Sequence, residues 1–145
     1  MQKIKIISSA FKNNERIPSK YTCDGIDVNP PLKFQNIPNG TKSLALIVDD
    51  PDAPMGTWIH WIVWNINPTE EINEATVPGI EGINDFNKTS YGGPCPPLGI
   101  HRYFFKIYAL KTKLDLNSNA RKRDLEEAME GKIIAKGEIM GLYSR

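Results

Sequence analysis

The sequence predicts a mainly β protein, an antiparallel β-sandwich with one short helix near the C-terminus. Apolar and β-branched runs recur along the chain, separated by clusters of glycine, proline and asparagine that are typical of turns. Only one stretch, residues 121–130, has the apolar spacing of an amphipathic helix. Many strands and a single late helix favour two packed sheets over a helical or an alternating fold.

The elements follow one another in an order that the local patterns define. The strand at 43–48 is a continuous apolar run between turn signals, so we expect it inside a sheet. The helix presents Leu125, Ala128 and Met129 on its inner face, and Gly131 suits the position after its last turn. The strands are expected at residues 4–7, 32–34, 43–48, 58–66, 101–110 and 133–143.

The strand at 58–66 is apolar on both alternating sets of positions, which predicts an interior strand buried on both faces. Its one titratable residue, His60, should lie on the same face as Trp58 and Ile62 and should need a polar partner. Alternation places the other residues on two faces, with Trp58, Ile62, Trp64 and Ile66 on one and Ile59, Trp61 and Val63 on the other.

Two loops carry most of the polar chemistry. Residues 49–54 contain three aspartates and two prolines, a composition that disfavours both helix and strand and predicts a fixed bend. Residues 77–99 are rich in glycine and proline and show little periodicity. Phe86, Tyr91 and Leu98 give this segment apolar anchors, so we expect an ordered binding loop.

Length and charge limit the classes of function. The 145 residues suit a single domain spanning 1–145. Lys and Arg number 18 against 17 Asp and Glu, which argues against nucleic acid as a partner. The sequence shows no membrane-spanning run and no signal peptide, so we expect a cytoplasmic protein without integral membrane association. Cys23 and Cys95 should stay reduced in an ordinary cytosol.

The candidate site residues stand at strand ends beside these loops: Asp50, Asp52, His60, His101 and Tyr103. Two histidines and two aspartates could bind zinc, but their spacing matches no compact ligand motif. A hydrolase would need a nucleophile in contact with a base, and neither Ser90 nor Cys95 stands in a nucleophile motif. The histidines could also be packed core residues satisfied by nearby aspartates.

Three ordered motifs resemble the phosphatidylethanolamine-binding protein family, in particular its bacterial and archaeal, Raf-kinase-inhibitor-like branch. The first two are Asp50-Pro51-Asp52-Ala53-Pro54 and Trp58-Ile59-His60-Trp61. The third is Gly93-Pro94-Cys95-Pro96-Pro97-Leu98-Gly99-Ile100-His101-Arg102-Tyr103. The flanking segments 21–25, 30–32, 84–86 and 141–145 agree as well, so the resemblance covers essentially the whole chain.

The resemblance implies a β-sandwich with a small cavity at one end that binds phosphate-like and carboxylate anions. It also implies a cis peptide in the acidic loop, at Ala53–Pro54. It places the loops of Cys23 and Cys95 toward the cavity end, so we expect these two residues to be near neighbours. The long C-terminal helix of the animal members has no counterpart here. The residues implied to line the cavity are Asp50, Asp52, Pro54, Trp58, His60, Gly93, Pro97, His101 and Tyr103.

Within such a cavity, aspartates that accept hydrogen bonds from the histidines should raise the histidine pKa values and orient both rings. The histidines and Tyr103 could then donate to the anion, together with the backbone N–H groups of Gly92 and Gly93. Arg102 alternates to the other face of its strand and should pair with an acid outside the cavity.

We therefore expect a binding protein with a small anion pocket for a phosphate- or carboxylate-bearing ligand, serving a regulatory role. We expect no catalytic activity, no cofactor and no metal. A protease inhibitor of the carboxypeptidase type, or a kinase inhibitor, acting through a surface loop is the main alternative. A hydrolase of phosphorylated small molecules is the third. The expected partners are the small ligand, a protease or kinase in the second case, and a second copy of the chain in a homodimer.

Overall fold

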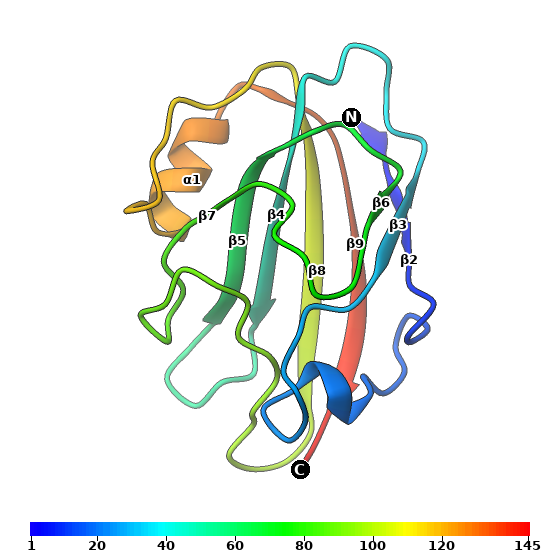
Figure 1. Ribbon diagram of the computed structural model, residues 1–145, viewed down its shortest axis with the longest axis vertical. Coiled ribbons are helices and arrows are strands. Elements are labelled where there is room, and N and C mark those ends of the chain that lie inside the picture. Colours follow the sequence, from blue (N-terminus) through cyan, green and yellow to red (C-terminus); the bar gives the residue numbers. More distant parts are fainter.

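The computed structural model describes residues 1–145 and shows two facing β-sheets (Figure 1). Neighbouring strands pair antiparallel except β1 and β9, which are parallel. The predicted β-sandwich is therefore confirmed. The large sheet has the order β1 (Gln2–Lys3), β9 (Ile133–Tyr143), β8 (His101–Leu110), β4 (Ser43–Asp50), β5 (Trp58–Ile66) and β7 (Ile80–Glu81). The small sheet has the order β2 (Lys5–Ile7), β3 (Leu32–Gln35) and β6 (Glu71–Ile72).

The predicted helix is present as α1 (Lys122–Met129), and it packs on the outer face of the large sheet (Figure 1). Leu125 and Met129 are buried, and Ala128 packs beside them, as the apolar spacing predicts. The Asp124 carboxylate accepts a hydrogen bond from the Arg121 N–H (2.9 Å) and so caps the first turn. A short 3₁₀ helix, η1 (Ser19–Tyr21), had no counterpart in the sequence prediction.

Strands β4 and β5 lie at the centre of the molecule because both of their faces are covered. One face joins the larger core, between the two sheets, and the other joins a smaller core beneath α1. All eight residues of β4 are buried, which agrees with the expected interior strand.

The prediction that residues of β5 alternate regularly between its two faces is wrong at both ends of the strand. Ile59 lies in the core beneath α1 together with Ile62 and Trp64, whereas Ile66 lies between the sheets with Trp61. The pairing of β4 with β5 shifts register at two places, and such bulges change the face to which the following residues point. His60 consequently lies beside Tyr103, which belongs to the core between the sheets.

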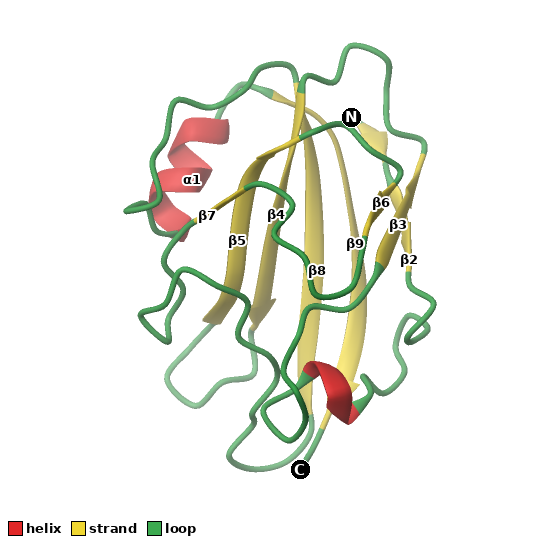
Figure 2. Cartoon of the chain, in the orientation of Figure 1, coloured by secondary structure: helices red, strands yellow, loops and turns green.

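Several loops meet at one end of the sandwich, near the C-terminus (Figure 2). They are the turn between β4 and β5, the segment that leads into β8, and the chain around η1. No helix in the structure is long and apolar enough to cross a membrane.

Candidate ligand-binding site

His101 and Asp50 form a buried pair at this end of the large sheet. Strands β4 and β8 are antiparallel neighbours, so the last residue of β4 lies near the first residue of β8. His101 Nδ1 is 2.7 Å from Asp50 Oδ2, and Nε2 is 3.0 Å from the carbonyl oxygen of Leu98. A carboxylate and a carbonyl both accept, so each ring nitrogen of His101 faces an acceptor.

His60 is held differently from the prediction, because its partner is a backbone carbonyl. Its Nδ1 is 2.7 Å from the carbonyl oxygen of Gly92, and its ring packs edge-on against Phe86 and Tyr103. Burial lowers the pKa of His60 below 6.5, and the Gly92 carbonyl and the charge of Asp50 offset this only in part. The expected net rise of the His60 pKa is therefore wrong, because burial outweighs the effect of the aspartates. Near neutral pH, Nδ1 carries the proton and Nε2 has no protein partner.

Tyr103 lies between the two histidines, with its ring 5.3 Å from that of His60 and 6.4 Å from that of His101. The side chain is 1% exposed, and its hydroxyl makes no hydrogen bond of good geometry, although the Asp50 carboxylate and the Cys95 backbone lie near it. Burial and the neighbouring Asp50 carboxylate raise the pKa of Tyr103, so the hydroxyl stays protonated. A buried donor without a partner costs about 1–3 kcal/mol, which a bound acceptor would relieve.

Asp52 faces away from the histidines, contrary to its expected role in orienting them. Its carboxylate forms two hydrogen bonds with the Arg102 guanidinium, each 2.9 Å long, and also accepts one from the Arg102 N–H. This pairing lowers the pKa of Asp52 to about 2. The prediction that Arg102 pairs with an acid is confirmed.

The acidic loop is a bend, as predicted, but the predicted cis peptide is wrong. The chain contains no cis peptide bond, so Ala53–Pro54 is trans. The loop turns instead through local contacts. The Asp52 N–H donates to Asp50 Oδ1 (2.7 Å), and Gly56 follows with a φ of 110°, which glycine adopts readily.

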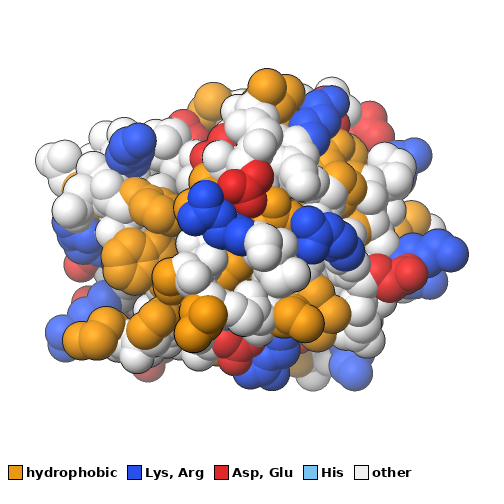
Figure 3. Space-filling model, turned by 90° about the horizontal axis from the view of Figure 1, so that it is seen from below, with side chains coloured by type: hydrophobic (Ala, Val, Ile, Leu, Met, Phe, Trp, Pro, Cys, Tyr) orange, Lys and Arg blue, Asp and Glu red, His pale blue; other side chains and the backbone are white.

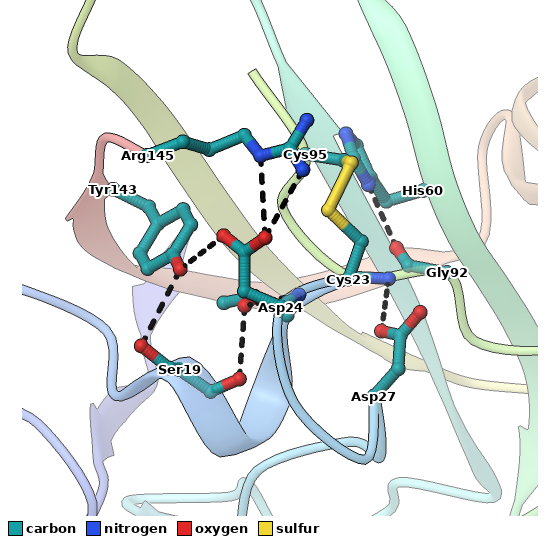
Figure 4. Close-up of a disulfide and its surroundings, with 11 residues drawn as sticks. Ser19, Cys23, Asp24, Asp27, His60, Gly92, Cys95, Tyr143 and Arg145 are labelled. Carbon is teal, nitrogen blue, oxygen red and sulfur yellow. Dashed lines mark hydrogen bonds and ion pairs between the residues drawn. A yellow bond between two sulfur atoms is a disulfide. The ribbon is translucent and has the colours of Figure 1, made fainter. Parts of the chain in front are cut away.

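The segment that leads into β8 is tied to the chain around η1 by a disulfide (Figure 4). Cys23 and Cys95 are bonded with their Cα atoms 5.4 Å apart, which confirms their predicted proximity and overturns the expectation of free thiols. The Cys23 N–H also donates to the Pro94 carbonyl (3.1 Å). These links hold Gly92, the partner of His60, against the neighbouring loop.

The backbone N–H groups expected to face an anion are already in use. The Gly92 N–H donates to the carbonyl of His60 (3.1 Å), and the Gly93 N–H donates to Asp27 Oδ1 (2.8 Å; Figure 4). A Cβ atom on Gly93 would collide with the Tyr21 carbonyl and the Asp27 carboxylate, so glycine is required there for close approach.

The C-terminal residues fasten the same loop from the other side (Figure 4). The buried Tyr143 hydroxyl donates to Asp24 Oδ2 (2.6 Å), and the Arg145 guanidinium bonds the same carboxylate. These hydrogen bonds from Tyr143 and Arg145 lower the pKa of Asp24. The chain around η1 is thus held by the disulfide and by the end of the chain.

The structure brings four of the nine predicted residues together, namely Asp50, His60, His101 and Tyr103. Trp58 packs edge-on against Phe86 and forms part of the wall. The ligand role of the nine residues stays a prediction. Sequence reasoning missed Asp27, and it named Phe86 only as an apolar anchor of its loop, without placing the ring against His60. Phe86 belongs to the segment 84–86, whose buried Asn84 donates to the carbonyls of His60 and Ser90.

Exposed apolar side chains surround this constellation. Met55 is 95% exposed, Leu98 84% and Ile100 68%, and the predicted residues Pro54 and Pro97 are also exposed. Seen from below, apolar side chains gather over part of this end of the molecule (Figure 3). No three His, Cys, Asp or Glu side chains are grouped as metal ligands anywhere in the structure.

The class of protein defined by these features is a β-sandwich with two histidines and a tyrosine collected at one end. The model of the family described as "Phosphatidylethanolamine-binding protein" matches residues 7–144. The chain belongs to the phosphatidylethanolamine-binding protein family.

Several relatives share nearly the whole chain. A UPF0098 protein of Pyrococcus horikoshii is 53% identical over 150 residues, covering 96% of this chain and 76% of its own length. One from Methanothermobacter thermautotrophicus is 49% identical over 144 residues, with 94% and 95% covered. Neither of these two names describes an enzyme.

Two solved structures have the same fold. The phosphatidylethanolamine-binding protein homolog CT736 of Chlamydia trachomatis superimposes with a TM-score of 0.95 at 41% identity, covering 100% of this chain and 99% of its own. YbcL of Escherichia coli, described as a new member of the mammalian family, superimposes with a TM-score of 0.91 at 31% identity, with 99% of each chain covered.

Proposed function

We propose that the constellation of His60, His101 and Tyr103 binds the phosphate or carboxylate group of a small ligand, and that the protein acts by binding, in a regulatory role. The observation that carries this proposal is the Tyr103 hydroxyl, a buried donor between two histidines with no partner of its own. An anionic oxygen is the partner that such a donor lacks. Membership in a family named for binding a phospholipid supports the same ligand chemistry.

His101 supplies the charge in this proposal. Its Nδ1 is fixed on Asp50, so its Nε2 is the nitrogen that can donate to a ligand. In the structure Nε2 donates to the Leu98 carbonyl, which occupies the place of an anionic oxygen. Leu98 is largely exposed and is followed by Gly99 at a φ of 76°, with no atom near the position of a Cβ. The ligand therefore displaces the Leu98 carbonyl from His101.

Binding is favoured over turnover because the site offers no activated nucleophile. Cys95 is held in the disulfide and cannot act as a thiolate. No hydrogen bond joins the Ser90 hydroxyl to a base, since the two histidines bond Gly92, Asp50 and Leu98.

Inhibition of a protease or kinase is a second candidate, and it rests on the exposed Met55, Leu98 and Ile100 around the constellation. Side chains of this kind on exposed loops suit contact with another protein. This candidate would be favoured if the wild type inhibited a carboxypeptidase and the Leu98→Ser variant did not, while the variant still bound phosphate.

Titration calorimetry with inorganic phosphate tests the anion proposal. Tyr103→Phe removes the unpartnered hydroxyl, which contributes about 0.5–1.5 kcal/mol as a hydrogen bond, so the affinity should fall about two- to tenfold. The thermal midpoint should not fall, because a buried group without a partner is removed. Tyr108→Phe, on the other side of the large sheet, is the control and should bind as the wild type does. No detectable binding by the wild type, or equal binding by Tyr103→Phe, would overturn the proposal.

A further inference from the structure

A surface hollow lies away from the histidines. It has a volume of about 970 Å³ and runs between the N-terminal strands β1 and β2 and the strands β8 and β9. This volume is at the upper end of the range for ligand sites. Ile4, Ile6 and Phe11 lie beneath it as part of the core between the sheets. We call this hollow the N-terminal groove.

The N-terminal groove carries an unbalanced positive charge. Lys3, Lys5, Lys12 and Lys136 line it, are exposed and form no ion pair. Yet the whole chain has a formal net charge of only +1. These four lysines therefore form a local basic patch on a nearly neutral protein.

The two remaining charged side chains of the groove do not cancel this patch. Lys106 Nζ is 3.0 Å from the buried Asp49 carboxylate. Burial lowers the pKa of Lys106, but the Asp49 and Glu138 carboxylates raise it by more, so Glu138 also acts on this lysine. Glu138 stands opposite Lys106 in the register of β8 and β9 and is the one acidic residue that lines the groove, so the four exposed lysines leave a positive excess.

The groove also borders a free strand edge. Strand β2 is outermost in the small sheet, and its Ile6 is paired in register with Phe34. The Phe34 N–H donates to Glu70, on the far side of β3, so the Ile6–Phe34 pair exchanges no hydrogen bonds. The backbone N–H and C=O groups of Ile6 consequently point outward from the sheet, where an added strand could bond them.

We propose that the N-terminal groove binds an extended acidic segment of another protein. The segment adds as a strand along the edge at Ile6, and its carboxylates lie beside Lys3, Lys5 and Lys136. Strand addition supplies backbone hydrogen bonds, and the lysines select acidic side chains. A single-stranded nucleic acid fits less well because it needs exposed aromatic faces, whereas Phe11 is buried and Tyr108 is half-buried. This inference does not depend on the proposed anion site.

The probe for this site is a capped synthetic peptide of alternating valine and glutamate, titrated against the full chain by fluorescence anisotropy. The wild type should bind it with an affinity that weakens as salt is added. Lys3→Gln/Lys136→Gln should lower the affinity at least about tenfold, by removing two charged contacts. Lys42→Gln/Lys113→Gln removes two exposed lysines outside the groove and should have no effect.

Two altered probes test the mode of binding. A peptide with glutamine in place of glutamate should bind at least about tenfold more weakly, and N-methylation of alternate peptide nitrogens should abolish strand addition. No binding at millimolar peptide, an equal loss in the control pair, or unchanged binding of the methylated peptide would overturn the proposal. The proposal would also be overturned if oligouridylate bound more tightly than the peptide and the Lys3→Gln/Lys136→Gln variant lost that binding.

Discussion

At the scale of single residues, the two histidines differ because they meet different partners. His101 donates to Asp50 and Leu98, and both of these groups only accept. His60 donates to one carbonyl and is otherwise surrounded by the rings of Phe86 and Tyr103. The same side chain therefore lies between two acceptors at one position, and against one acceptor and two aromatic rings at the other.

The lowered pKa of His60 predicts a loss of stability in mild acid. The unfolded chain takes up a proton near pH 6.5, whereas folded His60 does so only at lower pH. The free energy of unfolding should therefore fall as the pH drops through about 6.5, until the lowered pKa is passed. His60→Asn keeps an N–H group for the Gly92 carbonyl and should lose this part of the pH dependence. Urea denaturation across pH measures it, and parallel curves for the two proteins would contradict the assignment.

The same residue should couple anion binding to proton uptake. A bound anion favours the imidazolium form, so affinity should rise as the pH falls toward the lowered pKa of His60. Sulfate is the suitable probe because it does not itself titrate in this range. Calorimetry in two buffers of different ionisation enthalpy should show proton uptake by the wild type and less by His60→Asn. Binding without proton uptake at any pH would show that His60 Nε2 does not face the anion.

His101 and Arg102 are adjacent in the sequence, but their substitution should affect phosphate affinity differently. His101→Gln should lower phosphate affinity at least about tenfold, since a charge-assisted hydrogen bond contributes about 1.5–3 kcal/mol. Arg102→Ala should leave the affinity within about twofold, because its pairing with Asp52 is a surface ion pair turned away from the histidines. Titration of both variants with phosphate separates the two roles. Equal losses in both would place Arg102 in the site.

At the scale of elements, the sequence predicted strands better than loops. The bounds of β5, β8 and β9 agree with the predicted ranges because their apolar runs end at clear turn signals. The faces of β5 were wrong at Ile59 and Ile66, since a bulge arises from pairing with another strand and leaves no local pattern.

The site was predictable in its residues but not in its pairings. The strand ends carrying Asp50, His60 and His101 were evident from composition. Which acid faces which cation depends on the rotation of each strand and on distant backbone carbonyls, as Gly92 shows for His60. Asp27 could not be found because it follows no strand and acts across 66 positions, through the Gly93 N–H.

The disulfide predicts a strong dependence of loop structure on reduction. It joins residues 72 positions apart, and the chain-entropy model gives roughly 4 kcal/mol for a loop of this length. Cys23→Ser/Cys95→Ser should unfold at lower denaturant and bind phosphate more weakly, because Gly92 would position His60 less well. Reductant should shift the wild type toward the variant and leave the variant unchanged. Coincident unfolding curves with and without reductant would contradict this prediction.

At the scale of the whole molecule, the sandwich separates its two candidate surfaces. The histidines lie at the loop end, whereas the N-terminal groove follows the edge formed by β2 and β9. Strand β4 contributes to both sides of the large sheet, since Asp49 pairs with Lys106 and the next residue, Asp50, pairs with His101. The residues that line the groove do not include the two histidines, Tyr103 or Asp50, so substitutions at one surface should leave binding at the other intact.

The hydrogen bond between His101 and the Leu98 carbonyl has a consequence for the speed of binding. An anion can reach Nε2 only after this bond has opened, so the observed association rate should level off at high phosphate concentration, at the rate of loop opening. Stopped-flow tryptophan fluorescence, to which Trp58 beside Phe86 contributes together with Trp61 and Trp64, follows the process. A rate that rises linearly with phosphate throughout would mean that the loop is open beforehand. The chain thus carries its own competitor, and the rate at which the Leu98 carbonyl leaves His101 sets the upper limit on association.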